Sequence, residues 1–210
     1  MNNKNNYLSC DWGVGWANKI DFWTRRYVQN YHRYQFQTIP LPRSGPAIIA
    51  SNHISGIDSM LLVSACERPL RFLIAKEYYH NICFNWLCKV THSIPVDRAK
   101  KPENSLRHAY RALQQGEVVV VFPDAGFHID SDPPKKIKGG ASWLSKQTNT
   151  PIFPVRIEGI KAEKKIVSPV FIRSHAKLIA FEPLIPDDFE TKHEITEKLQ
   201  NILRGKNRNY

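Results

Sequence analysis

A histidine and an aspartate stand five residues apart in the stretch SNHISGID, directly after an apolar segment. A carboxylate that binds one imidazole nitrogen fixes the tautomer of the ring, and the other nitrogen is then available to remove a proton from a hydroxyl group. His53 and Asp58 are therefore candidates for a general base and the acid that orients it. Positions five apart on one helix point about 140° away from each other. We therefore expect His53 in the turn before a helix and Asp58 in its first turn.

The same residues also permit a purely structural interpretation. Ser55 and Asp58 have the Ser-x-x-Asp spacing of a helix capping box, and the apolar run SMLLVSAC begins at Ser59. In that interpretation Asp58 stabilises the start of a helix and His53 is a loop residue. The two interpretations are compatible, because the pair Ser55 and Gly56 allows His53 to lie in the turn while Asp58 stands in the first turn of the helix.

A second apolar run, VVVFPDAGFH, ends in a similar cluster of polar residues. It brings Asp124 and His128 directly after a β-branched segment. In open α/β sheets, functional groups gather where the strands end, so two such clusters predict one shared site. The set of two histidines and two carboxylates also fits a metal-dependent hydrolase, since Asp124-x3-His128 is a usable ligand spacing. This alternative stays open.

The elements that would position these residues alternate between strands and helices. The β-branched run at 117–123 is typical of a parallel strand that is buried on both faces. Alternation of this kind predicts an α/β fold with a mostly parallel central sheet covered by helices on both faces. We expect strands at 47–52, 70–75, 92–96, 117–123, 151–159 and once or twice within 169–184. We expect helices at 57–67, 102–116, 139–149 and 190–206, and a helix or surface lid at 81–90.

The first 40 residues form a separate, amphipathic helical segment in this interpretation, followed by a single catalytic domain at 41–210. Trp12, Trp16 and Trp23 repeat with helical spacing within residues 11–34. Aromatic stripes flanked by arginines suit the interface of a lipid bilayer, although such a stripe can also pack on the domain itself. We expect the tryptophans to enter the membrane with Arg25 and Arg26 at the level of the headgroups. The charged side of the helix would carry Lys19, Asp21, Arg25 and Arg26.

The composition narrows the class of partner. The 210 residues include 30 Lys and Arg against 19 Asp and Glu, a net charge of +11, which favours an anionic partner. The chain has neither an RNA-binding aromatic signature nor a zinc-finger spacing, so nucleic acid is not expected. There is no Cys-x-x-Cys pair, no signal peptide and no apolar run long enough to span a bilayer. We therefore expect a peripheral protein on the cytoplasmic side of a membrane.

Several motifs resemble those of the glycerolipid acyltransferases, the family of 1-acylglycerol-3-phosphate acyltransferases. NHISGID is similar to the Asn-His-x4-Asp block of that family, and SIPVDR is similar to its second block, which ends in an arginine. VVVVFPDAGFH stands where Phe-Pro-Glu-Gly-Thr-Arg-Ser is expected, IKGGA resembles the Lys-x-Gly segment after it, and PIFPVRIEG resembles the fourth block. The order and spacing fit from about residue 47 to residue 159.

The resemblance implies an O-acyltransferase. His53 would deprotonate the hydroxyl of a lysolipid acceptor, which attacks the thioester of acyl-CoA or acyl carrier protein, and Asp58 would orient the imidazole. No cofactor, metal or acyl-enzyme is implied. Arg98 would contact the acceptor phosphate, since a guanidinium fork matches phosphate oxygens. Further substrate contacts carry over to the matching positions Asn52, Asp124, Gly126, Phe127 and Lys138.

The third block departs from the pattern of the family. Asp124 stands in place of glutamate, Ala125 in place of glycine, and Phe127 in place of the arginine that helps to hold the acceptor phosphate. A lysine of PPKKIK, namely Lys135, Lys136 or Lys138, would have to supply the missing charge. The acceptor is therefore either 1-acylglycerol-3-phosphate or a lysolipid with a different headgroup, and a basic lipid-binding protein without activity is the non-enzymatic alternative. The acyl chain length and the carrier of the donor stay open.

Overall fold

A six-stranded sheet forms the centre of the molecule. The computed structural model describes residues 10–34, 37–79, 88–89, 91–97, 103–129, 132–133, 135–160 and 168–205. The strands lie in the order β3-β2-β4-β1-β5-β6, and only the β5–β6 pair is antiparallel. Their bounds are β1 Ala47–Ser51, β2 Leu70–Ala75, β3 Ile94–Val96, β4 Val118–Val121, β5 Ile152–Glu158 and β6 Lys177–Ala180. The mostly parallel sheet that the sequence predicts is confirmed.

The central strands are buried on both faces because their sequences are continuously apolar. Every residue of β1 and of β4 is buried, as expected for parallel strands covered on two sides. The two strands pair in register, with Ala50 opposite Val121. The residues that follow them therefore leave the sheet at the same level, which places the two polar clusters next to each other at the carboxyl edge.

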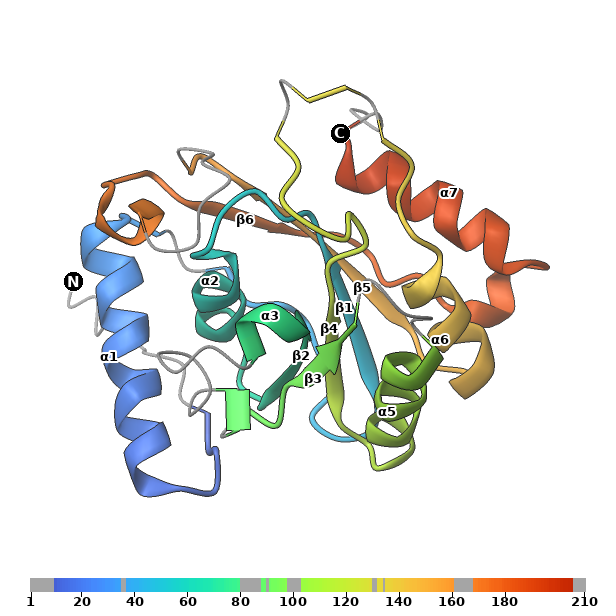
Figure 1. The fold of residues 1–210 in the computed structure, drawn as a ribbon, viewed down its shortest axis with the longest axis horizontal. Helices are drawn as coiled ribbons and strands as arrows, with labels where there is room; N and C mark the ends of the chain where they lie inside the picture. Colours follow the sequence, from blue (N-terminus) through green and yellow to red (C-terminus); the bar gives the residue numbers. More distant parts are fainter. Residues whose placement is uncertain are drawn as a thin grey trace, which may run out of the picture.

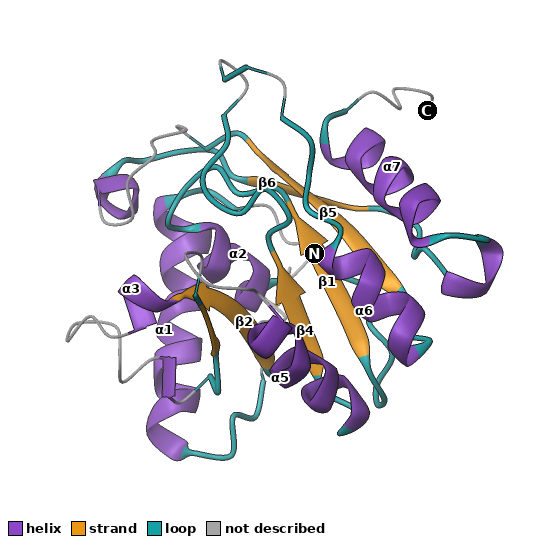
Figure 2. Ribbon diagram, turned by 45° about the vertical axis from the view of Figure 1, so that its right-hand side comes forward, coloured by secondary structure: helices purple, strands orange, loops and turns teal. Residues whose placement is uncertain are grey.

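Helices cover both faces of this sheet (Figure 1, Figure 2). On one face α1 (Gly15–Tyr31) and α2 (Asp58–Ser64) enclose a core with the residues before β1, and α3 (Lys76–Tyr79) follows β2. On the other face α5 (Glu103–Gln114), α6 (Gly140–Thr148) and α7 (Lys192–Leu203) enclose a second core. The predicted helix or lid at 81–90 lies almost entirely outside the described residues. The region 169–184 contains the 3-10 turn η1 (Ser168–Phe171) and one strand, and a second 3-10 turn, η2 (Pro186–Asp188), precedes α7.

Helix α1 presents a different face to the domain from the one the sequence indicates. It buries Ala17, Asp21, Arg25 and Val28. Asp21 and Arg25 form an ion pair at 2.6 Å, and the Arg25 guanidinium donates to the carbonyls of Ser64 and Cys66 at the end of α2. Carbonyls at a helix end need donors, and a guanidinium neutralised by Asp21 supplies them. The prediction that Arg25 lies at headgroup level is therefore wrong, because its side chain is buried.

Three aromatic residues of α1 lie on its outer side, whereas Tyr27 packs against the core. Trp16 is 45% exposed and Trp23 is 66% exposed, and Phe22 between them is 46% exposed. Of the predicted stripe, Trp16 and Trp23 lie on the helix and are exposed, whereas Trp12 precedes α1, and the face that packs on the domain carries a buried ion pair. Trp12 is half-buried, and its backbone N–H donates to the side chain of Asn18. Within the described residues, no helix is both long enough and apolar enough to cross a bilayer.

Candidate active site

His53 and Asp58 form a hydrogen-bonded pair at the exit of β1. The Nδ1 atom of His53 lies 2.8 Å from Oδ2 of Asp58, whose side chain is fully buried. A carboxylate accepts only, so Nδ1 carries the proton, and in the neutral imidazole Nε2 holds a free lone pair. The His53 side chain is 18% exposed. The arrangement can abstract a proton from a hydroxyl group placed at Nε2.

Asp58 also organises the turn that carries His53. Its Oδ2 accepts from the backbone N–H groups of Ile54 and Ser55, at 2.8 and 2.9 Å. The bond from Ser55 N–H is one half of a capping box, whereas Ser55 Oγ accepts from Ile57 N–H at 3.5 Å instead of completing it. The predicted placement is confirmed: His53 lies in the turn and Asp58 is the first residue of α2. The same carboxylate holds both the turn and the imidazole.

The exits of β1 and β4 meet through their backbones. The N–H of His128 donates to the carbonyl of His53 at 2.8 Å, and the N–H of Lys138 donates to the carbonyl of Pro123 at 2.8 Å. Two positive φ angles, +54° at Ala125 and +148° at Gly126, reverse the chain after Pro123. The loop after β4 is thereby folded back onto the turn that carries His53.

Two phenylalanine rings flank the His53 imidazole. The centroid of Phe122 lies 4.1 Å from that of the imidazole with an angle of 18° between the planes, and the centroid of Phe127 lies at 4.3 Å with an angle of 44°. Phe122 also packs against the core of the α1–α2 face. The aromatic ring that replaces the expected arginine thus contacts His53.

Asp124 is bound to the end of α7. Its side chain is 1% exposed, and its Oδ1 lies 2.5 Å from Nη2 of Arg204. Lys135 Nζ donates to the Asp124 carbonyl at 3.0 Å. The carboxylate therefore anchors the loop after β4, and the prediction that Asp124 contacts the substrate stays a prediction.

The hydrolase alternative requires His53, Asp58, Asp124 and His128 to bind one metal ion, and their side chains have other partners. Asp124 pairs with Arg204, whereas Nδ1 of His128 lies 3.7 Å from the carboxylate of Asp132. Within the described residues, His, Cys, Asp and Glu side chains form no group of three that is suited to hold a metal ion.

Asn52 fastens β1 to β5. Its Nδ2 donates to the carbonyl of Ile157 at 2.9 Å, and its Oδ1 accepts from the N–H of the same residue at 2.8 Å. The side-chain amide thus continues the ladder between the two strands beyond Ser51, and it holds the next residue, His53, at the edge of the sheet. Direct contact of Asn52 with substrate remains a prediction.

The cations predicted to bind a phosphate are only partly described. Arg98 lies outside the described residues. Lys135, Lys136 and Lys138 are exposed on the segment between the loop after β4 and α6. Lys138 is fixed by its backbone bond to Pro123, which places it close to the exit of β4.

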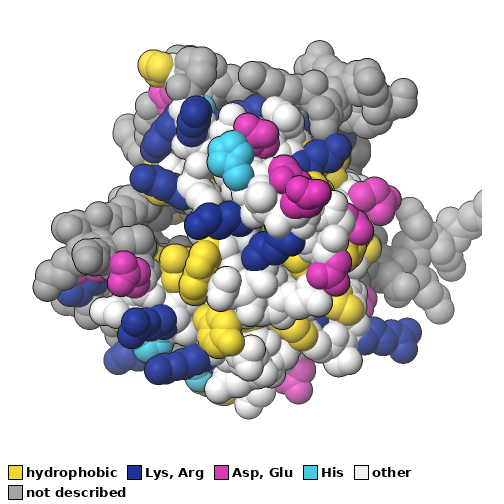
Figure 3. Space-filling model, turned by 90° about the vertical axis from the view of Figure 1, so that its right-hand side faces the viewer, with side chains coloured by type: hydrophobic (Ala, Val, Ile, Leu, Met, Phe, Trp, Pro, Cys, Tyr) yellow, Lys and Arg dark blue, Asp and Glu magenta, His cyan; other side chains and the backbone are white. Residues whose placement is uncertain are grey.

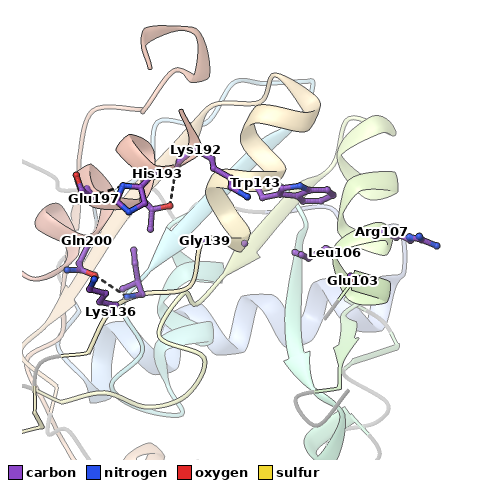
Figure 4. Close-up of a pocket in the computed structure, with 13 residues that line it drawn as sticks. Glu103, Leu106, Arg107, Lys136, Gly139, Trp143, Lys192, His193, Glu197 and Gln200 are labelled. Atoms are coloured by element: carbon purple, nitrogen blue, oxygen red, sulfur yellow. Dashed lines mark hydrogen bonds and ion pairs between the residues drawn. The ribbon is translucent and has the colours of Figure 1, made fainter. Parts of the chain in front are cut away.

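A groove of about 690 Å³ opens between α5, α6 and α7, on the opposite side of the sheet from α1 and α2 (Figure 4). Leu106, Ile137 and Trp143 contribute apolar surface to it, and Lys136 and Lys192 are among its charged residues. Figure 3 shows apolar side chains on this face among Lys and Arg side chains. The lining includes neither His53 nor Asp58, so the groove is distinct from the site around the imidazole.

Sequence reasoning missed Arg204 and the stacking of Phe122 and Phe127 on His53. Arg204 is 80 residues from Asp124 in the chain, and nothing in its local sequence marks it as a partner. Phe127 was recognised as a departure from the expected arginine. Its position over the imidazole depends on the reversal at Ala125 and Gly126, for which only Gly126 gave a signal.

Comparison with known proteins identifies similar chains. A family model described as "Acyltransferase" matches residues 33–158. A protein of Bacillus subtilis strain 168 named 1-acyl-sn-glycerol-3-phosphate acyltransferase is 29% identical over 150 residues, which are 71% of this chain and 72% of that one. A protein of the same name from Streptococcus pneumoniae is 23% identical over 141 residues, 66% of this chain and 51% of its own length.

A solved structure shares the fold. The crystal structure of the 1-acyl-sn-glycerophosphate (LPA) acyltransferase PlsC from Thermotoga maritima superposes with a TM-score of 0.71 at 20% sequence identity. The match covers 91% of this chain and 80% of that chain. The arrangement of strands and helices described above is therefore that of a known acyltransferase structure.

Proposed function

This chain belongs to the acyltransferase family, and from that premise we propose that it moves a fatty acyl group from a thioester to a hydroxyl of 1-acylglycerol-3-phosphate or a related lysolipid. The bond between His53 and the fully buried Asp58 carries the proposal. The names of the two similar bacterial proteins support the choice of acceptor. The donor is acyl-CoA or acyl carrier protein.

His53 is the general base in this mechanism. Nε2 takes the proton of the acceptor hydroxyl while the oxygen attacks the thioester carbonyl. The C–S bond then breaks, and the imidazolium returns the proton to the departing thiolate, so that an ester and a free thiol are formed and the imidazole is neutral again. Asp58 holds Nδ1–H throughout and stabilises the positive charge of the imidazolium. No acyl-enzyme is formed.

The headgroup phosphate would lie close to the cations that follow the β4 exit. We assign this role to Lys138, with Lys135 as its alternative, whereas Lys136 lines the groove on the other face of the sheet. Arg98 is assigned to the same phosphate from the resemblance of the second block alone. Gly126 has a positive φ and no side chain, which lets a substrate approach the backbone of the turn. Each of these assignments rests on the resemblance of the blocks and on the location of the lysine segment.

Replacing the proposed base tests the mechanism. His53→Ala is expected to lower kcat by about 10²–10⁴-fold, because general base catalysis is typically worth that much. Asp58→Asn is expected to lower kcat severely as well, because it removes the charge that supports the imidazolium. The measurement is release of thiol from acyl-CoA with lysophosphatidic acid as the acceptor, using purified protein.

His193→Ala is the matched control, since His193 is exposed and lies on α7. It is expected to retain the activity of the wild-type protein. Near-wild-type turnover by a His53→Ala protein with an unchanged circular dichroism spectrum would show that His53 is not the base. Unequal activities toward lysolipids with different headgroups would identify the acceptor.

We also propose that residues 1–40 attach the enzyme to the cytoplasmic face of a membrane, and that the acyltransferase domain comprises residues 41–210. Support comes from the outward position of Trp16, Phe22 and Trp23 on α1. The guanidinium of Arg26 lies 5.9 Å from the Phe22 ring, so a cation stands beside the apolar surface. Indole rings next to cations suit the headgroup region of anionic lipids.

A further inference from the structure

The proposed base is flanked by two rings that come from different parts of the site. Phe122 directly follows β4, and its ring stacks on the imidazole of His53 and, at 6.5 Å between centroids, on Phe72 of β2. Phe122 is thereby supported by the core. Phe127 lies on the loop five residues later and contacts the imidazole from there, with 4.3 Å between centroids.

The position of Phe127 is set by the backbone around it. Ala125 and Gly126 both have positive φ angles and turn the chain back toward β1. The residue after Phe127 then donates its N–H to the carbonyl of His53 at 2.8 Å. The peptide unit that follows Phe127 is therefore hydrogen-bonded to the backbone of His53, the residue on which the phenyl ring packs.

These contacts leave one edge of the imidazole available. Nδ1 is bound to Asp58, and the ring is contacted by two phenyl groups. The exposed 18% of the His53 side chain is the part that a substrate can reach. Apolar rings around a hydrogen bond also exclude water and strengthen the bond electrostatically.

An aromatic ring and an arginine act differently on a base that becomes positively charged. A phenyl ring attracts an imidazolium through its π electrons, whereas a guanidinium at the same distance repels it. At this position a phenylalanine therefore favours the charged form that appears in the transition state. Phe127 thus stabilises the imidazolium but cannot make the phosphate contact that an arginine would make.

We propose that Phe127 is a positioning residue that orients the imidazole of His53 toward the acceptor hydroxyl and stabilises its protonated form during transfer. The proposal rests on the proposed role of His53 as the base. It differs from the expectation that Phe127 binds the acceptor headgroup, since the ring acts through the histidine. The two roles predict different kinetics, because an orienting residue affects kcat and a headgroup contact affects KM.

The test compares Phe127→Leu with Phe127→Tyr in the full chain, with acyl-CoA and lysophosphatidic acid as substrates. Leucine keeps the apolar bulk without the π face. We expect Phe127→Leu to lower kcat by about three- to tenfold, the effect of one aromatic contact, with the KM of the acceptor unchanged. Phe127→Tyr retains the ring and is expected to restore kcat to the value of the wild-type protein.

An NMR measurement separates positioning from a general loss of structure. The ring-current shift of the His53 imidazole protons, assigned from their absence in His53→Ala, should change in Phe127→Leu and persist in Phe127→Tyr. Phe189→Leu, a half-buried phenylalanine on the α7 side of the sheet, is the matched control and should leave both kcat and the His53 resonances unchanged.

The following results would contradict the proposal. A raised acceptor KM with unchanged kcat in Phe127→Leu would place the ring on the acceptor. Unchanged His53 resonances would show that the ring does not pack on the imidazole, and a low kcat in Phe127→Tyr would exclude the role of the π face. If His53→Ala itself retains activity, the proposed mechanism fails; if His53→Ala is inactive and Phe127→Leu has wild-type kcat, only the role of Phe127 fails.

Discussion

Asp58 illustrates how one residue can satisfy two interpretations of a motif. Its Oδ2 accepts from Ile54 N–H, Ser55 N–H and His53 Nδ1. The first two bonds build the turn before α2, and the third orients the imidazole. Because all three donors converge on one oxygen, the turn and the imidazole are held by the same group. Removing the carboxylate should therefore affect both the local fold and the base.

Residue types and short spacings were sufficient to predict the pair of His53 and Asp58, because their geometry is local to one turn. They were not sufficient for Asn52 or Asp124. The partner of Asn52 is Ile157 and that of Asp124 is Arg204, at separations of 105 and 80 residues. The hydrogen-bond partners of such side chains are set by the tertiary fold, and no pattern in the nearby sequence predicts which partner each will have.

The pair of Asp124 and Arg204 supports a prediction about stability. Arg204→Met leaves a buried carboxylate without its counter-ion, and breaking a buried pair in this way typically costs roughly 3–5 kcal/mol in the free energy of unfolding. The double variant Asp124→Asn with Arg204→Met removes both charges and should be more stable than Arg204→Met alone. Urea denaturation of the three proteins measures the difference. Equal stabilities of the single and double variants would mean that the loss of Arg204 does not leave a destabilising charge at Asp124.

Among the elements, α1 departs most from the sequence-based prediction. A helix in this region could be inferred from the aromatic spacing, whereas its buried face could not, because polarity usually marks the solvent side. The exception has a physical cause. Asp21 and Arg25 neutralise each other, and the Arg25 guanidinium donates to carbonyls at the end of α2, so the buried guanidinium has both a counter-ion and acceptors.

The end of α1 supports a prediction about pH. His32 is fully buried, its Nδ1 lies 2.8 Å from Ser174 Oγ, and burial lowers its pKa from the ordinary value of 6.5, an effect that the Val170 carbonyl partly opposes. A lowered pKa in the folded state means that the unfolded chain binds the proton first. The contribution of His32 to stability is therefore complete well above pH 6.5 and decreases as the pH falls below that value.

Replacing His32 tests this linkage. The free energy of unfolding of the wild-type protein should fall between about pH 7 and pH 5.5, with a slope of at most about 1.4 kcal/mol per pH unit from one histidine. His32→Gln should show a smaller slope over the same range, and the exposed His193→Gln should not change it. An identical slope in His32→Gln and in the wild-type protein would assign the pH dependence to other groups.

At the scale of the whole molecule, the alternation of strands and helices was enough to predict the layers of the fold. The apolar runs of β1 and β4 predicted strands in a sheet that is covered by helices on both faces. The antiparallel β6 was not assigned an orientation, because the region 169–184 offers no turn signal that distinguishes one strand from two. The distribution of charge, +11 in total, indicated an anionic partner without saying which surface meets it.

The exposed large apolar side chains are unevenly distributed over the molecule. Within the described residues, the large apolar side chains that are exposed are Val14, Trp16, Phe22, Trp23, Phe171 and Ile185. The first four lie in α1 or next to it. Phe171 belongs to η1, and its carbonyl accepts a hydrogen bond from the hydroxyl of Tyr31 at 2.6 Å. This bond holds η1 next to the end of α1, as Figure 1 also shows. One side of the molecule thus carries nearly all of this apolar surface.

We therefore predict that α1 and η1 together contact the bilayer. Replacing both Trp16 and Trp23 with serine should weaken binding to vesicles of phosphatidylglycerol and phosphatidylcholine by at least about tenfold, because even partial burial of two indoles exceeds about 1.4 kcal/mol. Phe171→Ser should weaken it further, whereas Ile185→Ser, which lies before η2 and away from α1, should not. Half-buried Trp12 is left unchanged so that the fold is preserved.

High salt should release the wild-type protein only in part, since salt screens the attraction of Arg26 and Lys19 to anionic lipid but not the burial of apolar rings. Vesicle cosedimentation measures each effect, and equal binding by the wild-type protein and the Trp16/Trp23 double variant would mean that the aromatic face of α1 has another partner.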